Sequence, residues 1–136
     1  MKTRLQPKEQ YGFTMIELMI AMLILGILAT VAFHRYMNYQ CKAKQVEAKL
    51  SLGSIAKFQQ AYHAVFDTYG ISTNAIGYSA KGVSRYAYTI SEADATTFTA
   101  AASSVQPGIA REGAGDDEWT IDQSLILLHS KNPCTD

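Results

Sequence analysis

The stretch "GFTMIELMIAMLILGILATVAF", residues 12–33, is long and almost wholly apolar. Its 21 residues from Phe13 to Phe33 include only four that are not apolar, namely Thr14, Glu17, Gly26 and Thr30. An α-helix of this length reaches about 31 Å, which matches the roughly 30 Å hydrocarbon core of a bilayer. A buried core helix is disfavoured, because a chain of 136 residues has little room to enclose a helix that is apolar on all sides. The stretch therefore predicts a membrane-spanning helix.

The residues before this stretch are basic and predict its orientation. Lys2, Arg4 and Lys8 outnumber the single acidic residue, Glu9. Basic flanks stay in the cytoplasm, so the part that follows the helix is expected outside. An ordinary secretory signal peptide is disfavoured, because no A-x-A-like cleavage site follows and the apolar run is too long for a signal core. The net charge of the whole chain is zero, which gives no general bias toward nucleic acid.

The segment "YGFTMIELMI", residues 11–20, carries a resemblance to a known family. A short basic leader that ends in glycine, followed by Phe, three residues, Glu and a long apolar run, resembles a type IV prepilin signal. The similarity is strong over residues 8–33; beyond them it extends only to a general layout of a long helix and a small sheet. It implies that a membrane peptidase removes leader residues 1–12 by cutting between Gly12 and Phe13, and then methylates the new amine of Phe13.

Glu17 is the one carboxylate inside the predicted membrane span. An acidic residue in mid-bilayer costs about 2.5–3.5 kcal/mol on insertion scales, and ionisable groups there usually meet an opposite charge. The resemblance implies that Glu17 pairs with the amine of Phe13 on a neighbouring subunit and so sets the register of assembly. The alternative is a carboxylate that simply reaches the membrane interface from near the helix end.

The sequence predicts that the helix continues beyond the membrane span. It would run without a break from Phe13 to Tyr69 and be ended by Gly70. Many family members have a proline at the place where this chain has His34, so this helix lacks the break that proline would cause. Residues 13–33 are the expected membrane and filament-core part, and residues 34–69 the amphipathic part. An apolar stripe, expected to pack on a sheet, recurs at spacings of three and four: Ile55, Phe58, Tyr62, Val65 and Tyr69.

The C-terminal part, residues 70–136, predicts a connecting loop, an antiparallel sheet and a short tail. Three glycines in residues 70–84 indicate the loop. Alternating or short apolar runs predict three or four strands, within 84–91, 96–102, 118–122 and 125–129. Residues 103–117 are expected to form a surface loop. The predicted fold class is therefore α+β, a long N-terminal helix packed against a small three- to four-stranded antiparallel sheet.

The sequence predicts no catalytic residues, no metal site and no cofactor. Asp116, Asp117 and Glu118 lack the alternating spacing of a calcium loop, which favours a solvated acidic turn. The spacing of the three histidines suggests no catalytic triad, and no glycine-rich phosphate loop is present. The many tyrosines are most simply explained by packing.

The two cysteines, Cys41 and Cys134, are predicted to form a disulfide. Both would lie on the oxidising side of the membrane, and an even cysteine count in a small exported domain favours a bridge. The pairing would close a loop of about 94 residues, worth roughly 4–5 kcal/mol by the chain-entropy estimate. Members of the resembled family more often carry both cysteines in the C-terminal half. The open alternative is that Cys41 faces another subunit.

The resemblance implies a structural subunit, a major-type pilin that polymerises into a type IV pilus. Its partners would be identical subunits, the prepilin peptidase, the inner membrane and the pilus assembly machinery. It would lie in the inner membrane with a periplasmic C-terminus and then in a surface filament. Two alternatives stay open: a pseudopilin of a type II secretion system, and a minor adhesin-like or periplasmic binding subunit that uses residues 103–117 for recognition. Nucleic acid binding is left undecided.

Overall fold

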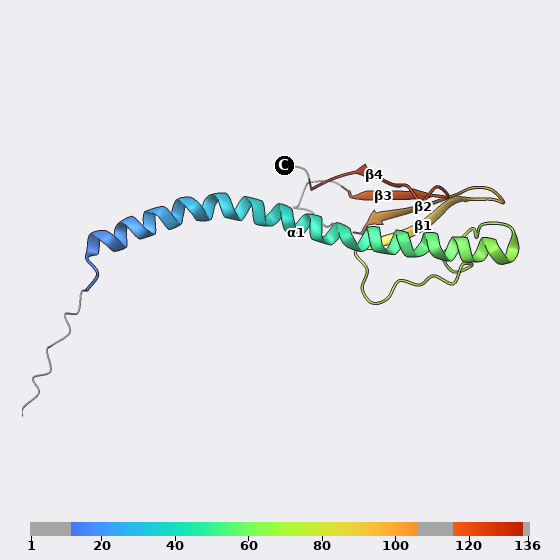
Figure 1. Cartoon of the computed structure of the whole chain (residues 1–136), viewed down its shortest axis with the longest axis horizontal. Coiled ribbons are helices and arrows are strands. Elements are labelled where there is room, and N and C mark those ends of the chain that lie inside the picture. The colour runs from blue at the N-terminus through green and yellow to red at the C-terminus, as the bar shows by residue number, and fades with distance from the viewer. Residues whose placement is uncertain (1–11, 106–115, 135–136) are drawn as a thin grey trace, which may run out of the picture. The chain divides into compact units, whose positions relative to one another are not determined.

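The computed structural model describes residues 12–105 and 116–134, which contain one helix and four strands (Figure 1). The elements are α1 (Met15–Phe66), β1 (Tyr86–Ala93), β2 (Phe98–Ser104), β3 (Glu118–Asp122) and β4 (Leu127–Lys131). The four strands form one antiparallel sheet in the order β1-β2-β3-β4. The predicted fold class is confirmed, with the strand number at the upper end of the expected range. The chain forms two units that divide in sequence after Tyr36.

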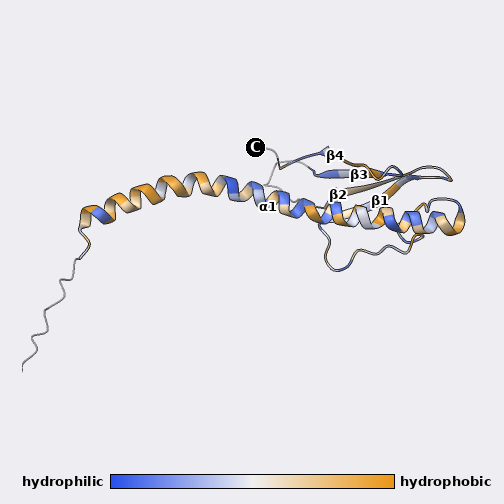
Figure 2. Ribbon diagram, viewed as in Figure 1, coloured by the Kyte–Doolittle hydropathy of each residue, from blue (hydrophilic) through white to orange (hydrophobic). Residues whose placement is uncertain are grey.

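The N-terminal unit contains the apolar first part of α1. Most of this part is coloured as hydrophobic in Figure 2. Its large apolar side chains are exposed, from Phe13 at 84% to Phe33 at 67%. The helix is long and apolar enough to cross a membrane by length and composition. It begins at Met15, two residues after the predicted start, because Thr14 caps its N-terminus.

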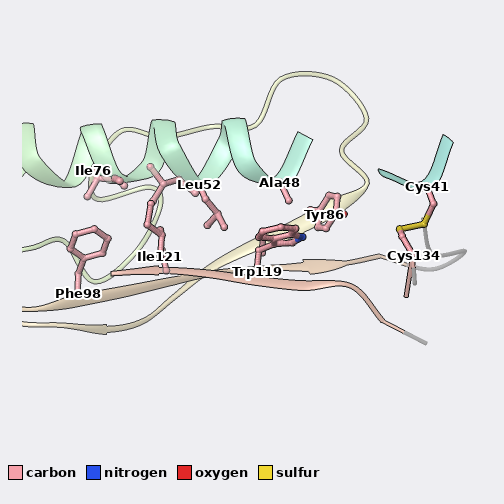
Figure 3. Close-up of a cluster of buried hydrophobic side chains, with 13 residues drawn as sticks. Cys41, Ala48, Leu52, Ile76, Tyr86, Phe98, Trp119, Ile121 and Cys134 are labelled. Carbon is pink, nitrogen blue, oxygen red and sulfur yellow. A yellow bond between two sulfur atoms is a disulfide. The ribbon is translucent and has the colours of Figure 1, made fainter. Parts of the chain in front are cut away.

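The second unit packs the rest of α1 on one face of the sheet. The core joins Leu52 and Ile55 from the helix to Phe98, Trp119 and Ile121 from the strands (Figure 3). On β2 and β3 the buried residues alternate with less buried ones, as expected where one face of a sheet is covered.

The buried face of α1 differs from the predicted stripe. Of the five predicted residues only Ile55 is fully buried, and Val65 is 72% exposed. The helix instead buries a face that begins further upstream and recurs at spacings of three and four; besides Ile55 and Ala56 it contains Cys41, Gln45, Ala48, Leu52 and Gln59. Two glutamines and two alanines occupy this face, so a search for large apolar residues missed its upstream half.

The helix ends at Phe66, three residues before the predicted Tyr69. Asp67 has a φ of 49°, and its N–H donates to His63 O at 2.9 Å, which is the left-handed C-terminal cap of a helix. Gly70 is therefore not the helix stop. Its N–H and C=O both bond the buried side-chain amide of Gln59 at 2.8 Å, and a Cβ at this position would lie 2.4 Å from Ile76 Cγ2.

Strand β4 begins at Leu127, two residues after the predicted start. Leu125 has a φ of 61° and its N–H donates to Asp122 O at 3.0 Å. The Asp122 carboxylate also accepts from the N–H of Ser124 at 2.9 Å. Asp122 thus organises a turn that takes up the first two residues of the predicted strand.

Glu47 links α1 to the start of β1. Its carboxylate accepts from Arg85 N at 2.8 Å, from Arg85 Nη1 at 2.9 Å and from Ser84 Oγ at 3.0 Å. Partial burial raises the pKa of Glu47, but these hydrogen bonds and the Arg85 charge outweigh burial, so the pKa is lowered overall. Because the folded pKa lies below the unfolded one, this link contributes stability above the unfolded pKa and loses it as the pH falls through the folded pKa.

Candidate functional site

Thr14 and Glu17 form a reciprocal cap at the start of α1. The Glu17 carboxylate, through Oε2, accepts from Thr14 N and from Thr14 Oγ1, both at 2.8 Å. In return Thr14 Oγ1 accepts from the N–H of Glu17 at 3.3 Å. This is the capping box expected of a Thr-x-x-Glu sequence. Within one chain, therefore, Glu17 bonds to a neutral neighbour three residues away.

The predicted processing residues lie next to this cap. Gly12 and Phe13 precede the helix and are exposed, and the predicted leader, apart from Gly12, lies outside the described residues. The structure thus places Gly12, Phe13 and Glu17 along one short segment.

Cys41 and Cys134 are bonded to each other in the structure, with a Cα–Cα distance of 5.7 Å (Figure 3). Cys41 is 7% exposed and Cys134 is 2% exposed. The bond joins the start of the buried helix face to the tail after β4. Asn132 holds the tail locally, because its Oδ1 accepts from Cys134 N at 3.0 Å and from Gln45 Nε2 at 3.1 Å.

A buried carboxylate, Asp117, lies at the centre of a polar cluster between α1 and the sheet. It is fully buried and accepts hydrogen bonds from four side chains, one each from α1, β1, β3 and β4. Oδ1 accepts from Gln45 Nε2 at 2.9 Å and contacts His129 Nε2 at 2.7 Å. Oδ2 accepts from Trp119 Nε1 at 2.9 Å and from the Tyr86 hydroxyl. The cluster therefore ties the helix to three strands.

The partners of Asp117 are themselves packed together. The Trp119 and His129 rings stack with centroids 3.6 Å apart, and Lys49 Nζ lies 4.6 Å from the indole centroid. Burial, and then the hydrogen bond to the Asp117 carboxylate, raises the pKa of Tyr86 far above its ordinary value. Tyr86 therefore remains a neutral donor to Asp117 at physiological pH.

The prediction of a solvated acidic turn at residues 116–118 is wrong for Asp117. A carboxylate is stable inside the protein only when hydrogen-bond donors surround it. Two of the donors to Asp117 lie 72 and 31 residues away in sequence, so no local pattern indicates them. Trp119, two residues on, is the single donor that strand periodicity could have placed near Asp117. The middle of the predicted recognition loop, residues 106–115, lies outside the described residues.

In the described part of the chain, no group of three or more His, Cys, Asp or Glu side chains is arranged to hold a metal ion. Asp117 contacts His129, but the other hydrogen-bond partners of the Asp117 carboxylate are an amide, a phenol and an indole. Three neutral donors around a carboxylate fit a structural role, because donors stabilise the anion and do not bind a cation.

Comparison with known families gives two adjoining matches. A prokaryotic N-terminal methylation motif matches residues 7–33. The family described as type IV minor pilin ComP, DNA uptake sequence receptor, matches residues 35–113, which is more than half of the chain.

Individual relatives point the same way. The type IV major pilin protein PilA of Myxococcus xanthus is 37% identical over 91 residues, which are 67% of this chain and 41% of that protein. The major pilin PilE1 of Neisseria gonorrhoeae is 54% identical over 41 residues, 30% of this chain and 25% of that protein. A probable minor fimbrial protein of Dichelobacter nodosus is 35% identical over 48 residues, 35% of this chain and 30% of that protein.

The chain thus spans about two fifths of the length of the Myxococcus relative and less of the other two. The methylation motif coincides with the segment that contains Gly12, Phe13 and Glu17, and the second family match covers most of the helix–sheet unit. This chain belongs to the type IV pilin family.

Proposed function

We propose that this chain is a structural subunit that is cleaved between Gly12 and Phe13, methylated at Phe13 and polymerised into a type IV pilus as a major-type pilin. Before assembly it spans the inner membrane once, with its C-terminal unit in the periplasm. The prepilin peptidase and the pilus assembly machinery act on it, and identical subunits are its filament partners. We propose no catalytic activity.

The observation that carries this proposal is the exposed apolar surface of residues 13–33. Its large side chains are between 50% and 84% exposed. In water such a surface would be strongly unfavourable, because each large apolar side chain left exposed forgoes about 1.5–3 kcal/mol. Lipid covers this surface before assembly, and the same surface of other copies covers it in a filament.

Glu17 fits this scheme with two separable contributions. Its hydrogen bonds to Thr14 use Oε2 and satisfy the first turn of the helix. Those bonds are to neutral donors, so they leave the negative charge of the carboxylate uncompensated. The amine of Phe13 on a neighbouring subunit supplies the opposite charge, and only a correctly registered neighbour brings it within reach.

A second candidate is a minor pilin that binds DNA. The match of residues 35–113 to a family described as a DNA uptake sequence receptor favours it. Against it stand the zero net charge of the chain and the commitment of Arg85 and Lys131 to carboxylates at 2.9 Å. DNA binding would appear as a mobility shift of duplex DNA that weakens steeply with salt.

A secretion pseudopilin is the weaker alternative, because the relatives above are named as pilins and fimbrial proteins. A minor adhesin-like subunit would use residues 103–117, most of which lie outside the described residues.

The test is deletion of the gene from the producing bacterium, followed by electron microscopy and by mass spectrometry of sheared filaments. The proposal expects long filaments that disappear on deletion and whose main subunit begins at a methylated Phe13. Gly12→Val should leave the leader uncut and abolish filaments, because glycine alone allows the close approach of the peptidase. Filaments that persist after deletion would assign the chain a minor role, and filaments built of uncut chains would overturn the proposal.

A further inference from the structure

A cavity of about 270 Å³ lies between the connecting loop after α1 and strand β1. Three tyrosines and three small polar residues form most of its wall: Tyr78, Tyr86, Tyr88, Thr73, Asn74 and Ser79. This volume is near the lower end of the range for ligand pockets, about 300–1,000 Å³. It suits a ligand of one ring.

The walls of the cavity are held in place before any ligand arrives. Tyr86 is 2% exposed and its hydroxyl is bonded to Asp117. Tyr78 packs edge-on against both Tyr88, at 5.9 Å, and Phe58 of the helix, at 6.1 Å. Within the loop, Tyr78 N donates to Thr73 O at 2.8 Å. A preformed wall lowers the entropic cost of binding.

The chemistry of the lining is neutral and rich in hydrogen-bonding groups. Among the described residues that line the cavity there is no Asp, Glu, Lys, Arg or His, so a phosphate, a carboxylate or an ammonium group would find no counter-charge. Asn74 offers an amide, and Thr73 and Ser79 offer hydroxyls. A wholly apolar ligand would leave these groups without partners.

The geometry points to a binding site for a single neutral sugar ring, with Asn74 and Ser79 bonding its hydroxyls and one of the Tyr78 and Tyr88 rings packing against its C–H face. A nucleobase fits less well, because a flat base stacks between parallel rings and these two tyrosine rings meet at 80°. This inference does not depend on polymerisation. A soluble, membrane-bound or filamentous form of the chain would carry the same cavity.

The test uses the full chain in detergent micelles and ligand-observed saturation-transfer NMR. The probes are the methyl glycosides of glucose, galactose, mannose, N-acetylglucosamine and N-acetylgalactosamine, with thymidine as the competing class. We expect at least one glycoside to bind saturably with a dissociation constant of about 1 mM, as for other ligands of this size.

Two variants locate the binding. Asn74→Ala removes the amide and should weaken binding about fivefold, the effect of one lost hydrogen bond; Gln123→Ala, on the exposed β3–β4 turn, is its control. Ala80→Trp fills the cavity, which Ala80 also lines, and should abolish binding; Ala64→Trp, on an exposed turn of α1, is its control. Circular dichroism verifies that each variant is folded.

The inference is overturned if none of the five glycosides binds saturably, if thymidine alone binds, or if the binding survives Ala80→Trp in a folded chain. Filament formation by the same cells is recorded separately, so failure of the sugar site is distinguishable from failure of the pilin proposal.

Discussion

The two parts of α1 differ in which side chains they expose and which they bury. From Met15 to Phe33 the helix exposes large apolar side chains, whereas from Cys41 to Gln59 it buries a face made largely of small and polar ones. The buried face of the second part is covered within one chain, because the sheet, Asp117 and the disulfide supply its contacts. The first part keeps its large apolar side chains exposed, and we propose that lipid or another copy covers them. A single helix thus joins the packed helix–sheet unit to an apolar segment that we propose contacts lipid or other copies.

Within the helix–sheet unit, we expect substitution of Asp117 to lower the free energy of unfolding the most. Asp117→Ala would leave the buried donors of Tyr86 and Trp119 without an acceptor and should lower the free energy of unfolding by about 3–5 kcal/mol. Urea titration in micelles, followed by the fluorescence of Trp119, measures this. The control is Glu118→Ala, which removes only the exposed pair with Lys131 and should cost less than about 1 kcal/mol. An equal loss of unfolding free energy in both variants would mean that the hydrogen bonds of Asp117 contribute no more to stability than an exposed ion pair.

The disulfide should come next. Replacing both cysteines with serine opens a link between residues 93 apart and should cost about 2–5 kcal/mol. The measurement is the same urea titration, compared with the wild-type chain under reducing conditions. Non-reducing mass spectrometry should find a peptide pair that joins Cys41 to Cys134 within one monomer. Two alkylatable thiols in the freshly exported chain, or a cross-link between chains, would support the alternative that Cys41 faces another subunit.

Gly70 lies at a crowded position and Gly53 at an open one, so the same substitution should change the free energy of unfolding in opposite directions. Gly70→Ala places a Cβ 2.4 Å from Ile76 Cγ2 and should lower the free energy of unfolding by about 1–3 kcal/mol. Gly53→Ala, within α1, meets no atom within 4 Å and should raise it by about 0.5–1 kcal/mol, since alanine is the better helix former. The two substitutions are chemically identical, so a shared sign would contradict the described packing of Gly70.

The sequence was a good guide where the signal is local. Strand β3 was predicted at its observed bounds, and β1 and β2 within two residues at each end, because alternation along a strand is a short-range pattern. The apolar stretch at residues 13–33 was equally plain. Helix and strand ends were less predictable, because Asp67 and Leu125 adopt positive φ values that their residue types rarely favour.

The interior of the helix–sheet unit was predicted least well. The buried face of α1 uses Gln45 and Gln59, which look like solvent-facing residues until their partners, Asp117 and Gly70, are in place. Polar residues can be buried when distant groups satisfy them, and that information is absent from any local window. His129 is likewise 12 residues from Asp117 in sequence, and its Nε2 contacts the Asp117 carboxylate at 2.7 Å.

We propose that Glu17 acts through its charge on a neighbouring subunit and not only as a helix cap. Glu17→Gln tests it, because glutamine keeps the acceptor of a capping box and removes the charge. Thr14→Ala is the reciprocal variant, since it removes the hydroxyl of the cap and keeps the carboxylate. Each variant is expressed as the sole copy, and sheared filaments and cleaved membrane-bound subunits are quantified.

We expect Glu17→Gln to be cleaved and inserted normally but to yield at least tenfold fewer filaments, while Thr14→Ala assembles at close to the wild-type level. Normal filaments from Glu17→Gln together with their loss in Thr14→Ala would contradict this proposal and reduce Glu17 to a local cap.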